Sequence, residues 1–308
     1  MDFEEELLTK AAWYYFMGKK TQQEISVLLG VSRIKVIRLL EKASATGLVQ
    51  FKLRENSARR MNIEKRLMEL YGLKDAFVIP TSPDAGISGV NDAIAEAAAM
   101  YIANRMPPGA FINIGYGDTT GKTLNNLAKM AEKPVSCISL TGGVSIYLPN
   151  ARSNVFNARL FLIPAPLIVS SKEMADAVMG EPQVKNIFQM ISLASFTILG
   201  IGGMNDEATI LKTGVLSKDD FLRLKMQGAV GDILCHYFDK DGSTLATPFE
   251  DRLISTPLSV IRNLPDVIGV AAGIEKLAAI KGALSYRYIN TLITNEDTGK
   301  RLTETERD

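Results

Sequence analysis

The stretch INIGYGDTTGKTL, residues 112–124, combines the residue types that hold a phosphate group. An apolar strand runs into two glycines, and a threonine-rich turn then opens a helix. Glycines let the backbone approach an anion closely, and a helix N-terminus supplies unpaired N–H groups and a partial positive charge. The GxxxxGK[ST] spacing of a Walker motif is absent, and an ordinary strand-to-helix turn would show the same pattern. The expected anion contacts are Gly117, Asp118, Thr119 and Thr120.

Three later segments also place glycines or acids where apolar runs end. SLTGGVS could add backbone donors from Gly142 and Gly143 beside the first loop. GAVGDILCHYFD places Asp232 after a glycine-rich turn, and AAGIEK places Glu275 just past another strand. Two carboxylates at strand ends would suit recognition of sugar hydroxyls. A helix cap at Asp232 and a first-turn helix charge at Glu275 explain these residues equally well.

The residue types that usually hold metals or perform catalysis are scarce. His236 is the only histidine and lies in an apolar stretch, so we expect it to pack rather than to catalyse. The two cysteines, Cys137 and Cys235, form neither a disulfide framework nor a metal-ligand spacing. We therefore expect no metal and no other cofactor.

The elements that must position these loops alternate between strand and helix, which predicts a mostly parallel sheet with helices on both faces. In such sheets ligands bind beyond the carboxyl ends of the strands. Candidate strands are 76–79, 110–114, 135–140, 160–163, 197–199, 267–271 and 289–293, and candidate helices are 61–71, 90–105, 119–131, 217–227 and 276–285.

The N-terminal residues predict a helix-turn-helix unit that follows a first helix over 3–17. Thr21 and Glu24 have the spacing of a capping box, and Gly30 ends the helix that they open. Ser32 caps the next helix. Residues 47–53 then alternate like a strand and suggest a small wing. A helical hairpin inside some other core is the alternative interpretation.

The second helix of this unit separates its side chains onto two faces. Val36 and Leu39 belong to an apolar face that can pack inward. On the opposite face, Arg38 could donate two hydrogen bonds to a guanine edge in the major groove. Basic residues along the borders are suited to phosphates. The expected DNA contacts are Gln22, Gln23, Ser32, Arg33, Ile34, Lys35, Ile37, Arg38 and Lys42.

The charge distribution agrees with a DNA-binding module confined to one end of the chain. The 308 residues carry a net charge of only +1, yet residues 19–60 contain 10 basic and 3 acidic side chains. We expect a helix-turn-helix domain over 1–54, a charged linker over 55–60 and an effector-binding and oligomerisation domain over 61–308. No apolar run approaches the ~18 residues of a membrane span, so a cytoplasmic protein without a membrane partner is expected.

The run YYFMGKKTQQEISVLLGVSRIKVIRLLEKASATGLVQF resembles the N-terminal domain of the SorC family of bacterial sugar-responsive transcriptional regulators. The likeness continues through IGYGDTTGKTL, SLTGGV, IPAPL, GAVGDIL, YIN and NEDT, and it covers essentially the whole chain. Members that respond to phosphorylated autoinducer-2 and regulators of sorbitol, erythritol and other polyols share this pattern. The resemblance implies a winged helix-turn-helix followed by a Rossmann-like α/β effector domain similar to sugar-phosphate isomerases, and a dimer or tetramer.

The function expected from these features is a regulator, most simply a repressor, whose binding to double-stranded operator DNA is controlled by a phosphorylated sugar or polyol. The alternative is a sugar-phosphate isomerase or deaminase with an accessory domain. One position departs from the family pattern. In autoinducer-responsive members a phosphate-holding lysine sits three residues before Tyr-Ile-Asn, where this chain has Ser285. Arg287 and Lys281 are the candidates to replace it.

Overall fold

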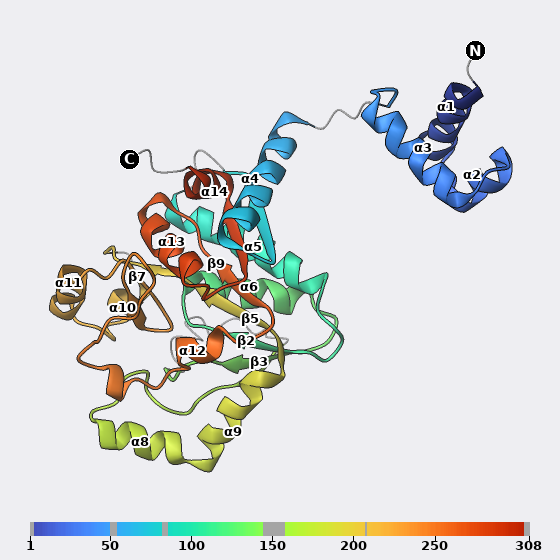
Figure 1. Ribbon diagram of the computed structural model, residues 1–308. Coiled ribbons are helices and arrows are strands. Elements are labelled where there is room, and N and C mark those ends of the chain that lie inside the picture. The colour runs from blue at the N-terminus through green and yellow to red at the C-terminus, as the bar shows by residue number, and fades with distance from the viewer. Residues whose placement is uncertain (1–2, 50–53, 82–85, 144–157, 207, 305–308) are drawn as a thin grey trace. The chain divides into compact units, whose positions relative to one another are not determined.

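The computed structural model describes residues 3–49, 54–81, 86–143, 158–206 and 208–304. The chain divides into two compact units, Met1–Ala58 and Arg59–Asp308, each with its own apolar core (Figure 1).

The first unit contains three helices, α1 (Phe3–Phe16), α2 (Gln22–Leu29) and α3 (Arg33–Ala45). Its core consists of one helical face from each, with Leu8, Ile25 and Leu39 buried among their neighbours. The wing strand expected over 47–53 lies partly outside the described residues, because these stop at Val49. The N–H of Val49 donates to the carbonyl of Ala43, so the chain turns back after α3.

Helix α4 (Glu55–Tyr71) corrects the expected linker and the helix expected from Met61. Residues 55–60 are helical and continue without a break into the amphipathic segment that buries Ile63 and Leu67. Their charged composition was typical of a linker, but none of these residues breaks a helix, and the packed turns that follow extend the helix toward its N-terminus.

The second unit is built on a seven-stranded sheet with the order β1-β10-β9-β5-β2-β3-β4, in which every neighbouring pair is parallel. The central strands are buried on both faces, as expected of a sheet covered on both sides by helices. The strands are β1 (Asp75–Ile79), β2 (Phe111–Ile114), β3 (Val135–Ser139), β4 (Ala158–Phe161), β5 (Ala194–Gly200), β9 (Val267–Val270) and β10 (Thr291–Asn295).

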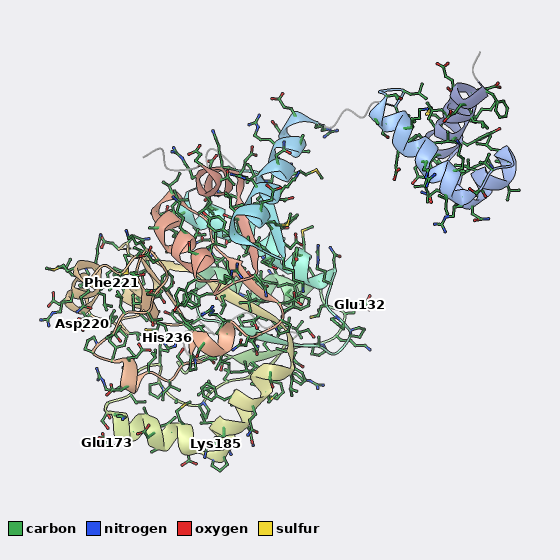
Figure 2. The ribbon with its side chains drawn as sticks, viewed as in Figure 1. Glu132, Glu173, Lys185, Asp220, Phe221 and His236 are labelled. Carbon is green, nitrogen blue, oxygen red and sulfur yellow. The ribbon has the colours of Figure 1, made fainter. Side chains whose placement is uncertain are left out.

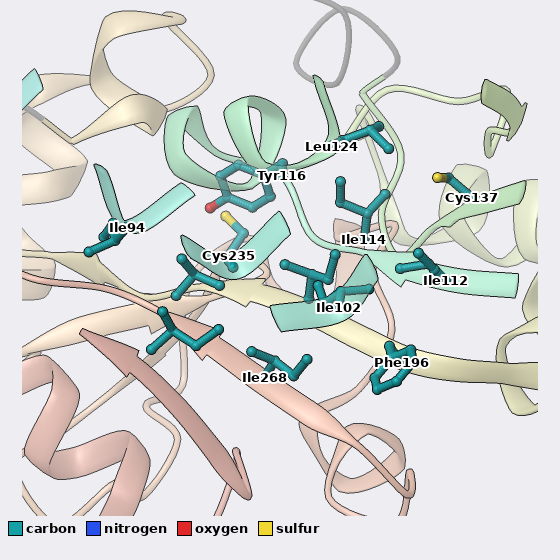
Figure 3. Packing of buried hydrophobic residues seen from close by; sticks show 14 of the residues in the cluster. Ile94, Ile102, Ile112, Ile114, Tyr116, Leu124, Cys137, Phe196, Cys235 and Ile268 are labelled. Atoms are coloured by element: carbon teal, nitrogen blue, oxygen red, sulfur yellow. The ribbon is translucent and has the colours of Figure 1, made fainter. Parts of the chain in front are cut away.

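Two groups of helices cover the two faces of the sheet. Helices α5 (Ile87–Ala103) and α6 (Asp118–Met130) bury Ile94, Ile102 and Leu124 in the same apolar cluster as Ile112 and Ile114 of β2 (Figure 3). On the other face, α4, α13 (Leu277–Ser285) and α14 (Glu296–Thr303) bury a separate cluster. Within the described residues, the other α-helices of this unit are α8 (Lys172–Gly180), α9 (Pro182–Met190), α10 (Thr209–Lys212), α11 (Lys218–Met226) and α12 (Leu258–Ile261).

A small antiparallel sheet of β6 (Gly202–Gly203), β7 (Gly231–Ile233) and β8 (His236–Phe238) follows β5. Sequence periodicity did not predict it, because strands of two or three residues are too short to show alternation. The seven strands expected from the sequence all occur in the main sheet. The one placed over 160–163 lies earlier, at β4, where pairing with β3 fixes the register as Val135 opposite Ala158.

Candidate functional site

A cleft of about 420 Å³ opens where β2, β5 and β9 end. From β2 the chain passes to β3 and β4, whereas from β5 it passes to β9 and β10 in the opposite direction across the sheet. Such a switch point leaves a crevice beyond the carboxyl ends of the strands. Six of the eight residues expected to contact an effector line this cleft: Gly117, Asp118, Thr119, Thr120, Asp232 and Glu275.

Gly117 shapes the wall at the start of α6. Its φ of 136° is a conformation that side-chain-bearing residues rarely adopt, and it is the N-cap of the helix. A helix leaves its first N–H groups without carbonyl partners, and an N-cap glycine has no side chain to accept from them. These amides, together with the partial positive charge of the helix end, can therefore donate to an anion in the cleft.

The two threonines of this turn differ in what they can offer. The buried hydroxyl of Thr120 donates to the Gly117 carbonyl at 2.9 Å, so its one hydrogen is already used to hold the loop. The hydroxyl of Thr119 makes no hydrogen bond within the described part of the chain, although the side chain is 6% exposed and borders the cleft. Thr119 is therefore the better donor, and Thr120 supports the loop.

Asp118 is neutralised by a neighbouring lysine. Nζ of Lys122 lies 2.9 Å from Oδ2 of Asp118 and 2.9 Å from Oδ1 of Asp92, and Asn91 donates to Asp118 at 3.3 Å. Burial by itself would lower the pKa of Lys122, but the two carboxylates outweigh it and raise the pKa. The carboxylate at the start of α6 thus carries its own counter-ion.

Asp232 is the most enclosed acid of the cleft. It is 8% exposed, and its Oδ2 accepts hydrogen bonds from the Tyr116 hydroxyl at 2.7 Å and the Cys235 N–H at 3.1 Å. Burial raises the pKa of its carboxyl, and these two hydrogen bonds oppose that rise. A Cβ on Gly202, its register partner in β6, would overlap with Oδ1 of Asp232. Asp232 can occupy this position only because residue 202 is glycine.

The hairpin that carries Asp232 turns through two residues that are unusual for that geometry. Leu234 and Cys235 connect β7 to β8 with φ angles of 55° and 68°. A two-residue turn with both φ angles positive is normally made by Asn or Gly. The bond from the Cys235 N–H to Asp232 ties this turn to the carboxylate, and Leu234 lines the cleft. Figure 3 shows Cys235 beside Tyr116.

Lys276 is a cleft residue that the sequence did not single out. It directly follows Glu275 in the short 3₁₀ turn after β9, and it borders the cleft. Burial lowers the pKa of its ammonium, while Glu275 and Asp232 act in the opposite direction. It makes no ion pair with any acid that the structure describes. A lysine at the start of an apolar helix gave no local signal of this role.

Gly142 and Gly143 do not join the cleft, contrary to the expectation from SLTGGVS. The N–H of Gly142 donates to the Ile254 carbonyl at 2.8 Å, and that of Gly143 donates to the Ala165 carbonyl at 2.7 Å. Their amides are therefore used within the protein, and a Cβ on Gly142 would overlap with Pro166 and Ala165. Close packing, rather than ligand approach, explains this glycine pair.

Ser285 and its two suggested substitutes also lie away from the cleft. Ser285 ends α13, and β10 begins six residues later at Thr291, so this segment is at the amino edge of the sheet. Arg287 lines a different pocket, and Lys281 lines neither. The serine at 285 therefore removes no cation from the cleft, where Lys276 supplies one.

His236 packs as expected and is 8% exposed within the second unit (Figure 2). Its Nδ1 lies 2.8 Å from the Glu250 carboxylate, and its Nε2 lies 3.2 Å from the Thr256 carbonyl. Both ring nitrogens are occupied by protein partners, which leaves neither for proton transfer to a ligand. Cys137 and Cys235 are buried free thiols, and burial raises the pKa of each.

In the first unit, the local signals of a helix-turn-helix take the predicted form. The Thr21 side chain accepts from the Glu24 N–H, and the Glu24 carboxylate accepts from the Thr21 N–H at 2.8 Å. Gly30 ends α2 in the left-handed conformation with φ 66°. Ser32 caps α3 by accepting from the Lys35 N–H. The Ser32 oxygen thus accepts within the helix, while its O–H can still donate to a DNA phosphate.

Helix α3 presents the two faces that its periodicity predicts. Val36, Leu39, Leu40 and Ala43 are buried against α1 and α2. On the other side Ile34 is 64% exposed, Arg38 is exposed and Ile37 is partly exposed. An exposed helix of this shape, held at a fixed angle by a second helix, is the unit that enters a DNA major groove.

The flanking cations are partly engaged within the unit. Nζ of Lys35 lies 3.7 Å and Nζ of Lys42 lies 3.4 Å from the same Glu4 carboxylate oxygen on α1. Nε of Arg33 donates to the Gln22 side chain at 3.4 Å. Gln23 is exposed in the first turn of α2. These are solvent-exposed contacts of low stability, which phosphates can replace.

Comparison with known proteins assigns the chain to a family. Residues 55–304 match the family described as "Putative sugar-binding domain". The transcriptional regulator LsrR of Klebsiella pneumoniae is 32% identical over 301 residues, covering 96% of this chain and 92% of that protein. LsrR of Escherichia coli K12 is 33% identical over 299 residues, covering 96% and 93%. The chain belongs to the SorC family of sugar-binding transcriptional regulators.

Solved structures confirm the fold of this SorC-family regulator. The full-length sorbitol operon regulator SorC from Klebsiella pneumoniae matches with a TM-score of 0.71 at 23% identity, over 99% of this chain and all of that one. A DeoR family transcriptional regulator from Listeria monocytogenes matches with a TM-score of 0.70 at 21% identity, over 79% of this chain and 99% of that one.

The comparisons also decide between the two functions expected from the sequence. The similar proteins are named as transcriptional regulators, so the regulator is the correct interpretation and the isomerase is not. None of the helices that the structure describes has the length and apolar character needed to cross a membrane.

Proposed function

We propose that this SorC-family regulator responds to a phosphorylated sugar or polyol held in the cleft at the carboxyl ends of β2, β5 and β9. The observation that carries the proposal is the position of Lys276. This cation lines the same cleft as the N-terminus of α6, has a pKa lowered by burial and forms no ion pair with a described acid. A phosphate dianion would supply the missing counter-charge and accept from the α6 amides.

The two remaining acids suit the hydroxyl groups of the same ligand. Glu275 is exposed at the cleft, and Oδ2 of Asp232 accepts from Tyr116 and Cys235, which leaves Oδ1 as the oxygen available to a ligand. Carboxylates accept hydrogen bonds from sugar hydroxyls, whereas they repel a phosphate. The ligand would therefore lie with its phosphate toward Gly117 and Lys276, and with its hydroxyls toward the two carboxylates.

At the other end of the chain, we propose that α3 reads operator DNA through Arg38, Ile34 and Ile37. Gln22, Gln23, Arg33, Lys35 and Lys42 would contact phosphates. One such helix covers few base pairs, so two half-sites bound by a dimer or tetramer would give useful specificity. The protein would act in the cytoplasm as a repressor of a sugar or polyol operon. Its domains would be residues 1–54 for DNA and 61–308 for effector and oligomer.

The ligand would control DNA binding because its affinity differs between two arrangements of the oligomer. Thermal unfolding of the full chain against matched pairs of sugars and sugar phosphates tests this. At 100 times its Kd, a ligand raises the free energy of unfolding by about 2.7 kcal/mol. We expect a shift with one phosphorylated compound, no shift with its parent sugar, and a weakened operator complex in its presence. A parent sugar as effective as its phosphate would contradict the proposal.

A further inference from the structure

A second, smaller pocket lies at the opposite edge of the sheet from the cleft. Its volume is about 180 Å³, and its walls come from the residues just before β1 and β10 and from the first residue of β9. Strand β9 connects the two places, since Val267 lines this pocket and Val270 lines the cleft. At about 3.3 Å per residue the two ends of the strand are roughly 10 Å apart.

Two arginines line this pocket without an acid to neutralise them. Neither Arg262 nor Arg287 forms an ion pair with a carboxylate in the described part of the chain. Asp266, which directly precedes pocket residue Val267, is already engaged by Lys74. Both side chains are exposed to solvent, where water and salt screen their charges, so a bound anion would be held by paired N–H donors rather than drawn in to relieve repulsion.

Each guanidinium is positioned by a specific neighbour. The Arg262 guanidinium lies 4.9 Å from the centre of the Tyr286 ring, in a cation–π contact. Arg287 extends over Gly72, where an added Cβ would lie 3.7 Å from Nη2. The polar side chain of Asn290 is occupied, since it donates to Pro265 and accepts from the Val267 N–H. The guanidinium groups are therefore the charged donors of the pocket.

The backbone of Arg287 gives an independent reason to assign a role to its side chain. It follows α13 with φ 58°, and the N–H groups of Arg287 and Tyr288 donate back to Leu284 and Ala283. This hydrogen-bond pattern is a Schellman motif, in which the left-handed residue is usually glycine. The chain does use glycine at other left-handed positions, such as Gly30 and Gly72. An arginine here strains the backbone, and strain of this kind accompanies binding sites.

We propose that Arg262 and Arg287 form a second oxyanion site, which takes a free phosphate-sized anion and is separate from the effector cleft. Arg guanidinium groups present paired N–H donors that match the oxygens of phosphate, so two of them can hold one dianion. The site requires no sugar, because the other polar side chains of the pocket, Tyr71, Tyr288 and Asn290, already make hydrogen bonds within the protein. It does not depend on the identity of the effector in the cleft.

The test titrates inorganic phosphate against the thermal midpoint of the full chain at constant ionic strength. Because phosphate alone can also enter the cleft, all variants carry Lys276→Met. In that background we expect phosphate to remain stabilising, and Arg287→Gly to weaken the apparent affinity for phosphate about ten- to hundred-fold. Arg262→Gln should give a similar loss. Glycine relieves the strained conformation, so Arg287→Gly is expected to keep the fold.

Lys19→Gly is the matched control, because Lys19 is another non-glycine residue with positive φ, at 50°, and also carries one positive charge. It should leave the phosphate response unchanged. A response that survives both arginine substitutions, or one that Lys19→Gly also removes, overturns the proposal. A change in oligomeric state without any change in the phosphate response would also overturn it, by assigning the pocket to a second copy of the chain.

Discussion

The hydroxyl of Tyr116 donates a 2.7 Å hydrogen bond to Oδ2 of Asp232, across 116 positions of sequence. Tyr116 lies in the loop that follows β2, and Asp232 lies in the hairpin that follows α11. The bond joins the turn proposed to bind phosphate to the acid proposed to contact sugar hydroxyls, and both residues are buried. The cleft is thus one connected structure rather than two loops that happen to meet.

Asp232→Asn should change stability in a pH-dependent way. Burial raises the pKa of Asp232 in the folded state above the value of about 3.9 expected when unfolded. Between these two values the folded state holds the extra proton, so the wild-type protein loses stability as pH rises through that interval. Asparagine lacks this loss. As pH rises from 4, the thermal midpoint of the variant should increase relative to that of the wild-type protein. A difference between the two midpoints that does not change with pH would contradict the prediction.

Gly202→Ala should displace Asp232, because the new Cβ would overlap with Oδ1. We expect a loss of about 1–3 kcal/mol in the free energy of unfolding, together with a weaker thermal shift by the effector. Gly121→Ala in α6 is the matched control, since no atom lies within 4 Å of its added Cβ. Alanine there should stabilise the helix by about 0.5–1 kcal/mol. If the two variants changed stability and ligand response equally, overlap with Asp232 would not explain why residue 202 is glycine.

Lys276→Met should raise stability and abolish the response to a sugar phosphate. Burial lowers the pKa of Lys276 in the folded state, so the wild-type protein loses stability as pH falls from about 10 through that lowered pKa, and the loss is complete below it. Methionine removes that cost and also removes the counter-charge for phosphate. The gain should shrink as the pH approaches about 10. Thermal midpoints with and without ligand measure both effects; a variant that still responds fully would remove Lys276 from the site.

Thr119→Val and Thr120→Val should separate ligand binding from loop support. The Thr119 hydroxyl has no described partner. Its removal should therefore weaken binding of the sugar phosphate by about 1.5–3 kcal/mol and leave the stability of the ligand-free protein unchanged. Thr120 donates to Gly117, so its removal should cost the free protein about 0.5–1.5 kcal/mol. Titrations of both variants, with unfolding curves of the free proteins, check the difference. The reverse pattern would assign the donor to Thr120.

Arg38→Ala and Arg33→Ala should differ on operator DNA. Arg38 projects from the exposed face of α3, and its loss should cost about 1–3 kcal/mol and relax the preference at one base pair. Arg33 lies at the border of the helix beside Gln22. Its loss should weaken binding to all DNA sequences equally and reduce the slope of log affinity against log salt concentration by about 1. Affinities for an operator and its single-base variants at several salt concentrations measure this. A uniform loss with Arg38→Ala would make Arg38 a phosphate contact.

The sequence by itself determined the features that depend on near neighbours. The capping box of Thr21 and Glu24, the left-handed Gly30 and the strand-to-helix turn at Gly117 each involve residues a few positions apart. Their hydrogen bonds and backbone angles are set locally, so pattern and spacing are sufficient to predict them. The alternation of apolar runs likewise predicted the parallel sheet, because each strand and helix has its own period.

Only the tertiary structure decided which of these residues share a site. It placed Lys276 in the cleft, excluded Gly142 and Gly143, and showed that Asp232 depends on the absence of a side chain at Gly202. These relationships link segments far apart in the sequence, and they depend on strand order and burial. No local sequence pattern shows which residues share a site, because a lysine that lines a cleft and a lysine on the open surface are identical in the sequence. The positive charge of Lys276 in the cleft, which a bound anion would neutralise, is evident only in the folded chain.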